Sequence, residues 1–557
     1  MRLLFSLMIA LPLMGMAGGG AQAAFPQTPE GLRAVVDSLQ LADDRYDPGA
    51  SLIRFYEGRA FHPAWLDPAH VRAMVAAVRA AETHGLDPET FHLAALQRLA
   101  GQQASAASAS GDQDARLDIL LSASFFRLAH SLAYGCLDPV RFNRDWNFTP
   151  VVDGQDAVDL LTAALADGRF QEHLENQAPS HPLYRRLRAA LANYRRIEAA
   201  GGWRPIPQGP LLEVGRRDPR VPLVRARLEL TGDLRVDTAG DSQVYDQPLA
   251  RAVLRFQERT RVDRESALVD DDDGAVGEET LKALNVPVGD RIRQLRVNLE
   301  RCRWLLHDQP ASFILVDMAG YRGYLFKDSE IIWRARIQVG DPYRETPSFR
   351  STVTRVEFNP TWTVPLGILQ RTVLPKIRKD LGYLEKQRMQ VFDRDRRPVD
   401  PAAVEWQRYT AARLPYRIVQ SPGPHNAVGR VKFIMPNKHF IFLHDTPHKS
   451  EFGLNDRAFS AGCIRVDKPF KLAKRLLDSP ADPWTIGRIR DILATGRTQR
   501  YQPPRPMPVL MVYLTAMVDD QEQVLFREDV YKRDLAVAEA LDRSAVPDEA
   551  TASQSEV

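Results

Sequence analysis

Hydrophobic and polar residues follow different patterns in successive parts of this chain. From residue 25 to residue 205, apolar residues recur every three or four positions, most clearly over 71–83 and 117–134, and this spacing predicts amphipathic α-helices. The Ala-, Ser- and Gln-rich segment 101–113 lacks that spacing and is expected to be a loop. The first part of the chain is therefore predicted to be a helical scaffold domain.

Residues 216–287 carry short helical patterns separated by turn residues. Gly274 and Gly277 permit a tight turn before the last pattern, and the two glutamates that follow favour the start of a helix. This part of the chain resembles the three-helix peptidoglycan-binding domain, with a small helical spacer as the alternative. A further helix, predicted over 291–306, connects it to the rest of the chain, and Cys302 lies on the apolar face of this helix.

From residue 310 to residue 541 the pattern changes to short apolar runs separated by turn residues, which predicts a β-rich domain. The expected strands are 313–316, 324–326, 331–333, 353–358, 431–435 and 439–444, the last two joined by a hairpin turn at 436–438. An insertion at 366–416 opens with a charged helical stretch over 366–390 and is too long for a simple loop. We expect it to form a subdomain or lid over the β-rich core.

Composition agrees with an α+β multidomain protein. The chain has 557 residues, 44% of them hydrophobic and 26% charged, which is ordinary for globular protein but too long for one hydrophobic core. Its 74 basic and 71 acidic side chains leave a formal net charge of +3. There is thus no electrostatic case for a nucleic-acid partner.

Residues 1–23 have the three parts of a secretory signal peptide: a basic start, an apolar stretch and a small-residue segment that ends at Ala23. The apolar stretch is shorter than the roughly 20 residues that cross a bilayer, and an uncleaved anchor is the alternative. No later segment is apolar enough to span a membrane, so we expect a periplasmic protein without a transmembrane helix in its mature chain. The polar tail 542–557 is expected to be disordered.

Cysteine use singles out one thiol. Export places the protein in an oxidising compartment, yet the chain has only Cys136, Cys302 and Cys463, so at least one thiol is left without a partner in the chain. Cys302 lies on a helical apolar stripe and Cys136 follows a glycine that is expected to end a helix, so both are predicted to be structural. Whether these two pair is left open. Only Cys463 lies in loop-like sequence beside residue types that serve catalysis.

Cys463 and His444 form the candidate catalytic pair. Cys463 lies nineteen positions after His444, which closes an apolar, strand-like run. A thiol is a nucleophile only as the thiolate and needs a nearby base, and Gly462 allows backbone N–H groups to point at one place, as an oxyanion requires. Asp467 is expected to cap the helix that begins near Pro469.

The sequence around this pair resembles the L,D-transpeptidase catalytic domain family. Its signature is a histidine followed, after a loop, by Ser-x-Gly-Cys-[Ile/Val]-Arg, which residues 460–465 match. Further similar segments are Gly340 with Thr346-Pro347, 359–365, 429–433 and 444–447. With the helical and binding-like parts, they resemble the large periplasmic subgroup of the family. Ala461 is a departure, because many members have histidine there.

The resemblance implies a role for each matched residue. Cys463 would be the nucleophile, His444 the general base and later acid, and the backbone N–H groups of Gly462 and Cys463 the oxyanion donors. Substrate-binding or supporting roles are implied for Ser460, Asp445, Thr446, Arg465, Trp362 and Asn359. A structural ion pair is the alternative for Arg465, and packing of the β core for Trp362 and Asn359. In this family a backbone carbonyl usually orients the histidine; its identity is left open here.

The implied activity is that of an L,D-transpeptidase that forms 3→3 cross-links in peptidoglycan through a cysteine thioester, in cell-wall biogenesis and the control of cell shape. The implied partners are a tetrapeptide donor, an acceptor amine on a second stem peptide, and cell-wall synthases; acylation by carbapenems is implied too. No cofactor is expected, and no metal, since the acidic run 270–273 and the pair His444 and His448 do not fit calcium or zinc sites. Alternatives are an L,D-carboxypeptidase, a lipoprotein-anchoring transpeptidase, and an inactive wall-binding scaffold.

Overall fold

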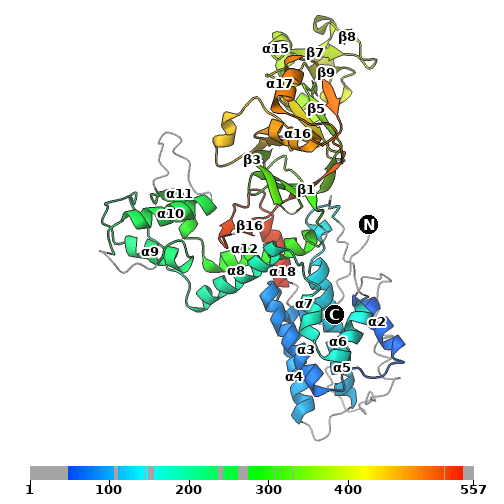
Figure 1. Ribbon diagram of the computed structural model, residues 1–557, viewed down its shortest axis with the longest axis vertical. Helices are drawn as coiled ribbons and strands as arrows, with labels where there is room; N and C mark the ends of the chain where they lie inside the picture. Colours follow the sequence, from blue (N-terminus) through cyan, green and yellow to red (C-terminus); the bar gives the residue numbers. More distant parts are fainter. Residues whose placement is uncertain are drawn as a thin grey trace, which may run out of the picture.

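The computed structural model describes residues 48–105, 111–144, 146–148, 156–235, 242–260, 274–307, 309–328, 330–519 and 521–543. The predicted signal peptide 1–23, the acidic run 270–273 and the tail beyond residue 543 lie outside these ranges. The described chain is elongated, with helices at one end, strands toward the other and a helical arm at one side (Figure 1). The predicted α+β multidomain class is confirmed.

Helices of the N-terminal part pack around a core of aromatic and aliphatic side chains, in which the rings of Trp65 and Phe170 stack 4.9 Å apart. Their bounds are α2 Pro48–Gly58, α3 Pro68–Ala80, α4 Leu93–Ser105, α5 Gly111–Tyr134, α6 Ala157–Asp167 and α7 Phe170–Glu175. The next helix, α8 Pro182–Ala199, belongs to a separate apolar core. The loop predicted over 101–113 is wrong in extent, because α4 continues to Ser105 and α5 begins at Gly111. Alanine and glutamine favour helix even without an apolar stripe.

The arm at the side of the molecule consists of α9 Val221–Leu230, α10 Gln247–Thr260 and α11 Glu278–Leu284 around their own apolar core. Gly274 approaches α10 so closely that a Cβ atom there would lie 2.0 Å from the Ala250 carbonyl oxygen, and its φ of +61° also favours glycine. The buried Tyr245 hydroxyl donates a hydrogen bond to the Gly274 carbonyl. The turn before α11 is therefore fixed by both contacts.

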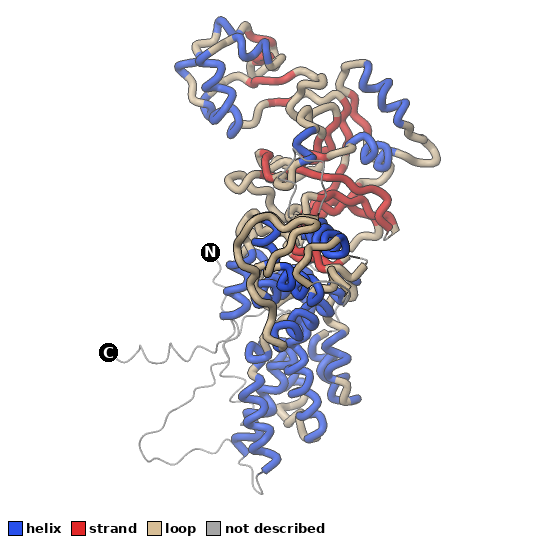
Figure 2. The backbone as a smooth tube through the Cα atoms, turned by 90° about the vertical axis from the view of Figure 1, so that its left-hand side faces the viewer, coloured by secondary structure: helices blue, strands red, loops and turns tan. Residues whose placement is uncertain are grey.

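Helix α12, Val288–Leu305, is the joint between the helical and β-rich parts. It packs against α8 and against α18, Asp534–Arg543, so the first residues of the predicted tail belong to a helix. Cys302 is fully buried on this helix, and neither it nor Cys136 is in a disulfide. Figure 2 shows the same order from the side, with helices below and strands above. Among the described helices, none is both long and apolar enough to cross a membrane.

The main sheet has the strand order β14-β5-β10-β11-β13-β3-β2-β1-β15-β4, and β12 also pairs with β3. Strand bounds are β1 Ser312–Asp317, β2 Arg322–Lys327, β3 Glu330–Gly340, β4 Arg350–Val353, β5 Arg355–Phe358, β10 Val431–Ile434, β11 Leu443–His444, β12 Ala458–Ser460, β13 Ile464–Val466, β14 Gln499–Tyr501 and β15 Met507–Val512. Only Thr354 separates β4 from β5, although they lie near opposite ends of the order. The sheet therefore curls back on itself, and its inner face forms one apolar core.

A second, smaller sheet, β6-β9-β7-β8, lies at the upper end of Figure 1 and has its own apolar core. Its strands are β6 Trp362–Thr363, β7 Met389–Phe392, β8 Pro398–Val399 and β9 Arg417–Gln420. The stretch predicted as helical over 366–390 is instead divided into α13 Leu366–Ile368, a π-helical turn Leu369–Val373, α14 Leu374–Lys379, α15 Gly382–Lys386 and the start of β7. Helices α16 Pro469–Leu477 and α17 Ile486–Ala494 pack on the main sheet, and β16 Ala516–Val518 pairs with β17 Val524–Phe526.

Candidate active site

Neighbouring parallel strands bring the two candidate catalytic residues together. His444 ends β11 and pairs with Arg465 of β13, while Cys463 directly precedes β13. The predicted strand 439–444 is wrong in length, because only Leu443–His444 is strand. Asn437 explains the difference: its side chain bonds the backbone of Met435, His439 and Ile441, which builds a wide loop in place of a tight hairpin turn.

His444 is buried, and its Nδ1 is hydrogen-bonded to the carbonyl oxygen of Asp445. Because a carbonyl only accepts, Nδ1 carries the proton and Nε2 is left as the ring atom that can take up a proton. Burial, and to a smaller extent the charges of Arg465 and Lys432, lower the pKa of His444 to about 3, although hydrogen bonding to the backbone of Asp445 and Val428 acts in the opposite direction. The imidazole is therefore neutral at neutral pH. The carbonyl that the sequence analysis left unidentified is that of Asp445.

The thiol of Cys463 is half-buried, with Sγ 3.8 Å from the carbonyl oxygen of Phe440. Burial raises the pKa of Cys463 above its ordinary value, against opposing effects from the backbone of Phe442 and from the charges of Lys432 and Arg465. The resting site thus holds a neutral thiol beside a neutral imidazole. Formation of the thiolate requires proton transfer or added positive charge at the moment of attack.

The loop around the thiol is tied by side-chain oxygens. Ser460 Oγ donates to the Cys463 carbonyl at 2.6 Å and accepts the Gly462 N–H at 3.0 Å. Gly462 has a φ of +108°, which favours glycine, and its carbonyl accepts a hydrogen bond from Thr346 Oγ1 at 2.9 Å. The Gly462 N–H, expected to point at an oxyanion, is thus already engaged by Ser460. The Cys463 N–H has no acceptor within the described part of the chain, so of the two expected oxyanion donors it is the one that is not engaged.

The other expected site residues divide into near and distant groups. Arg465 lies beside His444, and its Nη1 is 3.1 Å from Glu451 Oε2 and 2.9 Å from Gln338 Oε1. The structural ion pair is therefore present. Asp445 is buried, accepts the Arg430 N–H at 2.8 Å and pairs with Lys449, so its carboxylate holds the loop.

Thr446 is also buried in this loop, where its Oγ1 accepts the His448 N–H at 3.2 Å. Trp362 and Asn359 are not brought to the thiol. Trp362 lies on β6 and packs with the core of the smaller sheet, whereas the buried Asn359 side chain donates to carbonyls of Ile492, Leu493 and Arg497 near the end of α17. Trp362 therefore packs in the core of the smaller sheet, and Asn359 ties the end of β5 to α17.

Lys432 is a site residue that the sequence analysis did not single out. It lies opposite His444 on β10, and its Nζ is 3.6 Å from the centroid of the Phe442 ring. Its neighbours Val431 and Phe433 are fully buried in the core. Alternation along a strand therefore places Lys432 on the face of His444. The signal was the single charged residue within the apolar strand 431–435.

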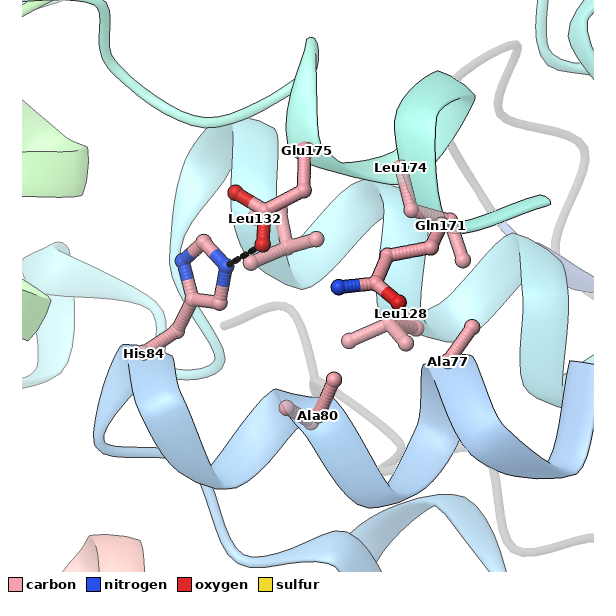
Figure 3. Close-up of a pocket in the computed structure, with 9 residues that line it drawn as sticks. Ala77, Ala80, His84, Leu128, Leu132, Gln171, Leu174 and Glu175 are labelled. Carbon is pink, nitrogen blue, oxygen red and sulfur yellow. Dashed lines mark ion pairs between the residues drawn. The ribbon is translucent and has the colours of Figure 1, made fainter. Parts of the chain in front are cut away.

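A cavity elsewhere in the molecule lies between helices of the N-terminal part (Figure 3). Its ionisable groups are already partnered: His84 Nε2 is 3.2 Å from Glu175 Oε1, and His84 Nδ1 is 2.9 Å from the Tyr184 hydroxyl. None of its lining residues comes from the strands that carry Cys463 and His444. This network stabilises the packing of the helices.

Comparisons with known proteins identify two parts of the chain. The model of the L,D-transpeptidase catalytic domain matches residues 311–492, and a model described as a scaffold domain matches residues 50–191. A Haemophilus influenzae protein recorded as a provisional L,D-transpeptidase is 33% identical over 221 residues, which are 40% of this chain and 44% of that protein. The chain thus aligns with less than half the length of this relative.

Solved structures give a weaker comparison. The L,D-transpeptidase of Xylanimonas cellulosilytica is 12% identical and the match covers 55% of this chain and 99% of that one, with a TM-score of 0.18. A mutant of the Enterococcus faecium L,D-transpeptidase is 11% identical, with coverage of 54% and 94% and a TM-score of 0.18. Scores this low carry no structural argument. This chain therefore carries an L,D-transpeptidase catalytic domain at residues 311–492, which contain both Cys463 and His444.

Proposed function

We propose that this protein is a periplasmic L,D-transpeptidase that forms 3→3 cross-links between peptidoglycan stem peptides through a thioester on Cys463. The observation that carries the proposal is the position of Cys463 and His444 on neighbouring strands within the matched catalytic domain. The family match supports a transpeptidase that acts on peptidoglycan. The cross-link type, the thioester and the residue roles are our inference.

In the first step, Cys463 Sγ attacks the carbonyl carbon on the L-centre of the third residue of a donor tetrapeptide. The Sγ–C bond forms, the C–N bond to the terminal D-Ala breaks, and the leaving amine takes up a proton. Because both groups are neutral at rest, the thiol proton passes to His444 Nε2 during attack and then to the leaving amine. The Asp445 carbonyl stabilises the imidazolium that forms transiently, because it accepts the Nδ1–H.

In the second step, the side-chain amine of a second stem peptide attacks the thioester. Its nitrogen bonds the carbonyl carbon, the Sγ–C bond breaks, and the amine proton returns through His444 to the sulfur. Both steps pass through a tetrahedral oxyanion. The Cys463 N–H would donate to it, and rotation of the Ser460 side chain away from Gly462 would free the Gly462 N–H as a second donor.

The remaining parts of the chain support this reaction in our proposal. The arm within residues 216–287 would hold peptidoglycan, the subdomain at 366–416 would cover the bound stem peptides and exclude water, and the signal peptide at 1–23 would direct export. The helical part within 25–205 would act as a scaffold, in keeping with the family model that matches residues 50–191.

Intact-protein mass spectrometry with a disaccharide-tetrapeptide tests the proposal. We expect an adduct on Cys463 that lacks the terminal D-Ala, followed by a 3→3 dimer. Cys463→Ala should abolish both, whereas the matched control Cys136→Ala, which removes another thiol that is not in a disulfide, should retain both. Tripeptide without dimer would favour a carboxypeptidase, and transfer only to a lysine peptide would favour lipoprotein anchoring. The absence of any adduct would contradict the proposal and favour a wall-binding scaffold.

A further inference from the structure

A row of polar side chains crosses the main sheet at His444. Successive cross-strand pairs join Arg500 of β14, Glu357 of β5, Lys432 of β10, His444 of β11, Arg465 of β13 and Gln338 of β3. Residues that pair across strands point to the same face, and the flanking residues of these strands lie in the core on the other face. His444 therefore lies between the two cations Lys432 and Arg465.

The cations of this row differ in how their charge is compensated. Arg500 Nε is 2.9 Å from Glu357 Oε1, and Arg355 approaches the same oxygen at 3.3 Å. Arg465 Nη1 is 3.1 Å from Glu451 Oε2. Lys432 forms no ion pair with a carboxylate in the described ranges, and its cross-strand neighbour Glu357 is shared by two arginines. Its ammonium thus shares its nearest cross-strand carboxylate with two arginines and has no carboxylate of its own.

The ammonium of Lys432 lies at the segment that borders the sulfur. Its Nζ is 3.6 Å from the centroid of the Phe442 ring. The carbonyl of Phe442 accepts the N–H of Ile464, the residue after Cys463, at 3.1 Å, and Cys463 Sγ is 3.8 Å from the Phe440 carbonyl. Lys432 is also half-buried, so water screens its charge less than that of a surface lysine.

His444 cannot provide the positive charge that cysteine enzymes commonly place beside a thiolate. Its pKa of about 3 keeps the imidazole neutral, because the ring is buried between two cations. A thiolate at this position still requires a cation, since burial alone favours the neutral thiol.

We propose that the ammonium of Lys432 is the counter-charge that stabilises the Cys463 thiolate, which makes Lys432 a positioning residue of the reaction. Arg465 is largely neutralised by Glu451 and plays the smaller part. The inference rests on the proposed function only in that Cys463 is the nucleophile. Removal of the Lys432 charge should then lower the thiolate fraction of Cys463 at neutral pH about tenfold, as one nearby charge commonly does.

The test is the pH profile of Cys463 alkylation by iodoacetamide in the full chain, followed by mass spectrometry of the Cys463 peptide. This readout needs no peptidoglycan substrate, so its failure is distinguishable from failure of the proposed function. Lys432→Met keeps most of the packing on Phe442 but removes the charge, and we expect its profile to move upward by about one pH unit. Lys432→Arg should restore a profile near that of the original protein. Lys471→Met, which removes an exposed lysine from α16, is the matched control and should change nothing.

Glu357→Gln gives a second test in the opposite direction. It removes the carboxylate opposite Lys432 and should move the alkylation profile downward, whether or not Lys432→Met folds. Both displacements together support the inference. An unchanged profile in folded Lys432→Met, or an unchanged or upward-moved profile in Glu357→Gln, would overturn it. If Lys432 had only a structural role, Lys432→Met and Lys432→Arg would both change the stability of the protein, and neither would move the pH profile of Cys463 alkylation.

Discussion

Thr346→Val tests whether the loop that carries Cys463 is held by a single hydroxyl. Thr346 is fully buried between β3 and this loop. Its Oγ1 accepts the N–H of Gly340 at 2.9 Å and donates to the carbonyl of Gly462, also at 2.9 Å. Valine has nearly the same shape but makes neither hydrogen bond, so the substitution removes the tie and leaves the packing in place.

The expected magnitude follows from these two bonds. A buried N–H left without an acceptor at Gly340 costs about 1–3 kcal/mol, and the lost bond to the Gly462 carbonyl costs about 1 kcal/mol more. The sum of about 2–4 kcal/mol corresponds to about a 30- to 1,000-fold increase in local opening. The same loosening should slow acylation of Cys463, because the thiol is then held in place less often.

Hydrogen exchange measured by mass spectrometry on peptides that contain Gly340 and Gly462 is the appropriate assay, because it reports opening of this segment without requiring the whole chain to unfold in two states. Thr346→Ser, which keeps the hydroxyl, is the matched control and should remain close to the original protein. If Thr346→Val exchanges as slowly as the serine variant and its acylation rate is unchanged, the reasoning that the hydroxyl holds the loop is wrong.

Further outcomes follow from burial and charge. Alkylation of Cys463 should rise about tenfold per pH unit to above pH 9, without the step near pH 6.5 that an ordinary histidine would give, because the Cys463 pKa is raised and that of His444 is about 3; stopped-flow alkylation checks both. Gly274→Ala should destabilise the arm by more than about 1 kcal/mol, measured by exchange of its helices, because a Cβ atom has no space there. Arg303→Met should destabilise the joint by about 3–5 kcal/mol in chemical unfolding, because it leaves the fully buried Glu300 unpaired.

The sequence allowed strands of the catalytic domain to be predicted where short apolar runs lie between turn residues. It singled out Cys463 and His444 by the loop position of the thiol and by the match of residues 460–465 to the family signature. It failed where side chains redirect the backbone. The Asn437 side chain makes hydrogen bonds to the backbone around it and so forms a wide loop. The pattern of apolar and polar residues does not predict such hydrogen bonds. Asp467, expected to cap α16, instead pairs with Arg336, while Lys468 stands at the cap position without a side-chain bond.

Other misses concern contacts between distant segments. Lys432 acquires its place from the register of β10 and β11, and register depends on the whole sheet. The helical stretch expected to fill 366–390 is broken near Asp380, and Met389 then joins a sheet whose partner strand β9 lies beyond residue 416. Such pairings are set by tertiary contacts and override local propensity.

The joint at α12 has a consequence for how the protein is made. Asn298 and Arg301 on this helix complete their hydrogen bonds only with Thr515 and Asp534, more than 200 residues later in the chain. Because the chain is synthesised from its N-terminus, these polar groups of α12 have no partners until Thr515 and Asp534 have been made. Packing of the C-terminal helix α18 is therefore the last step of folding. A chain that stops before residue 515 should have less stable N-terminal helices, and proteases should cleave them more readily.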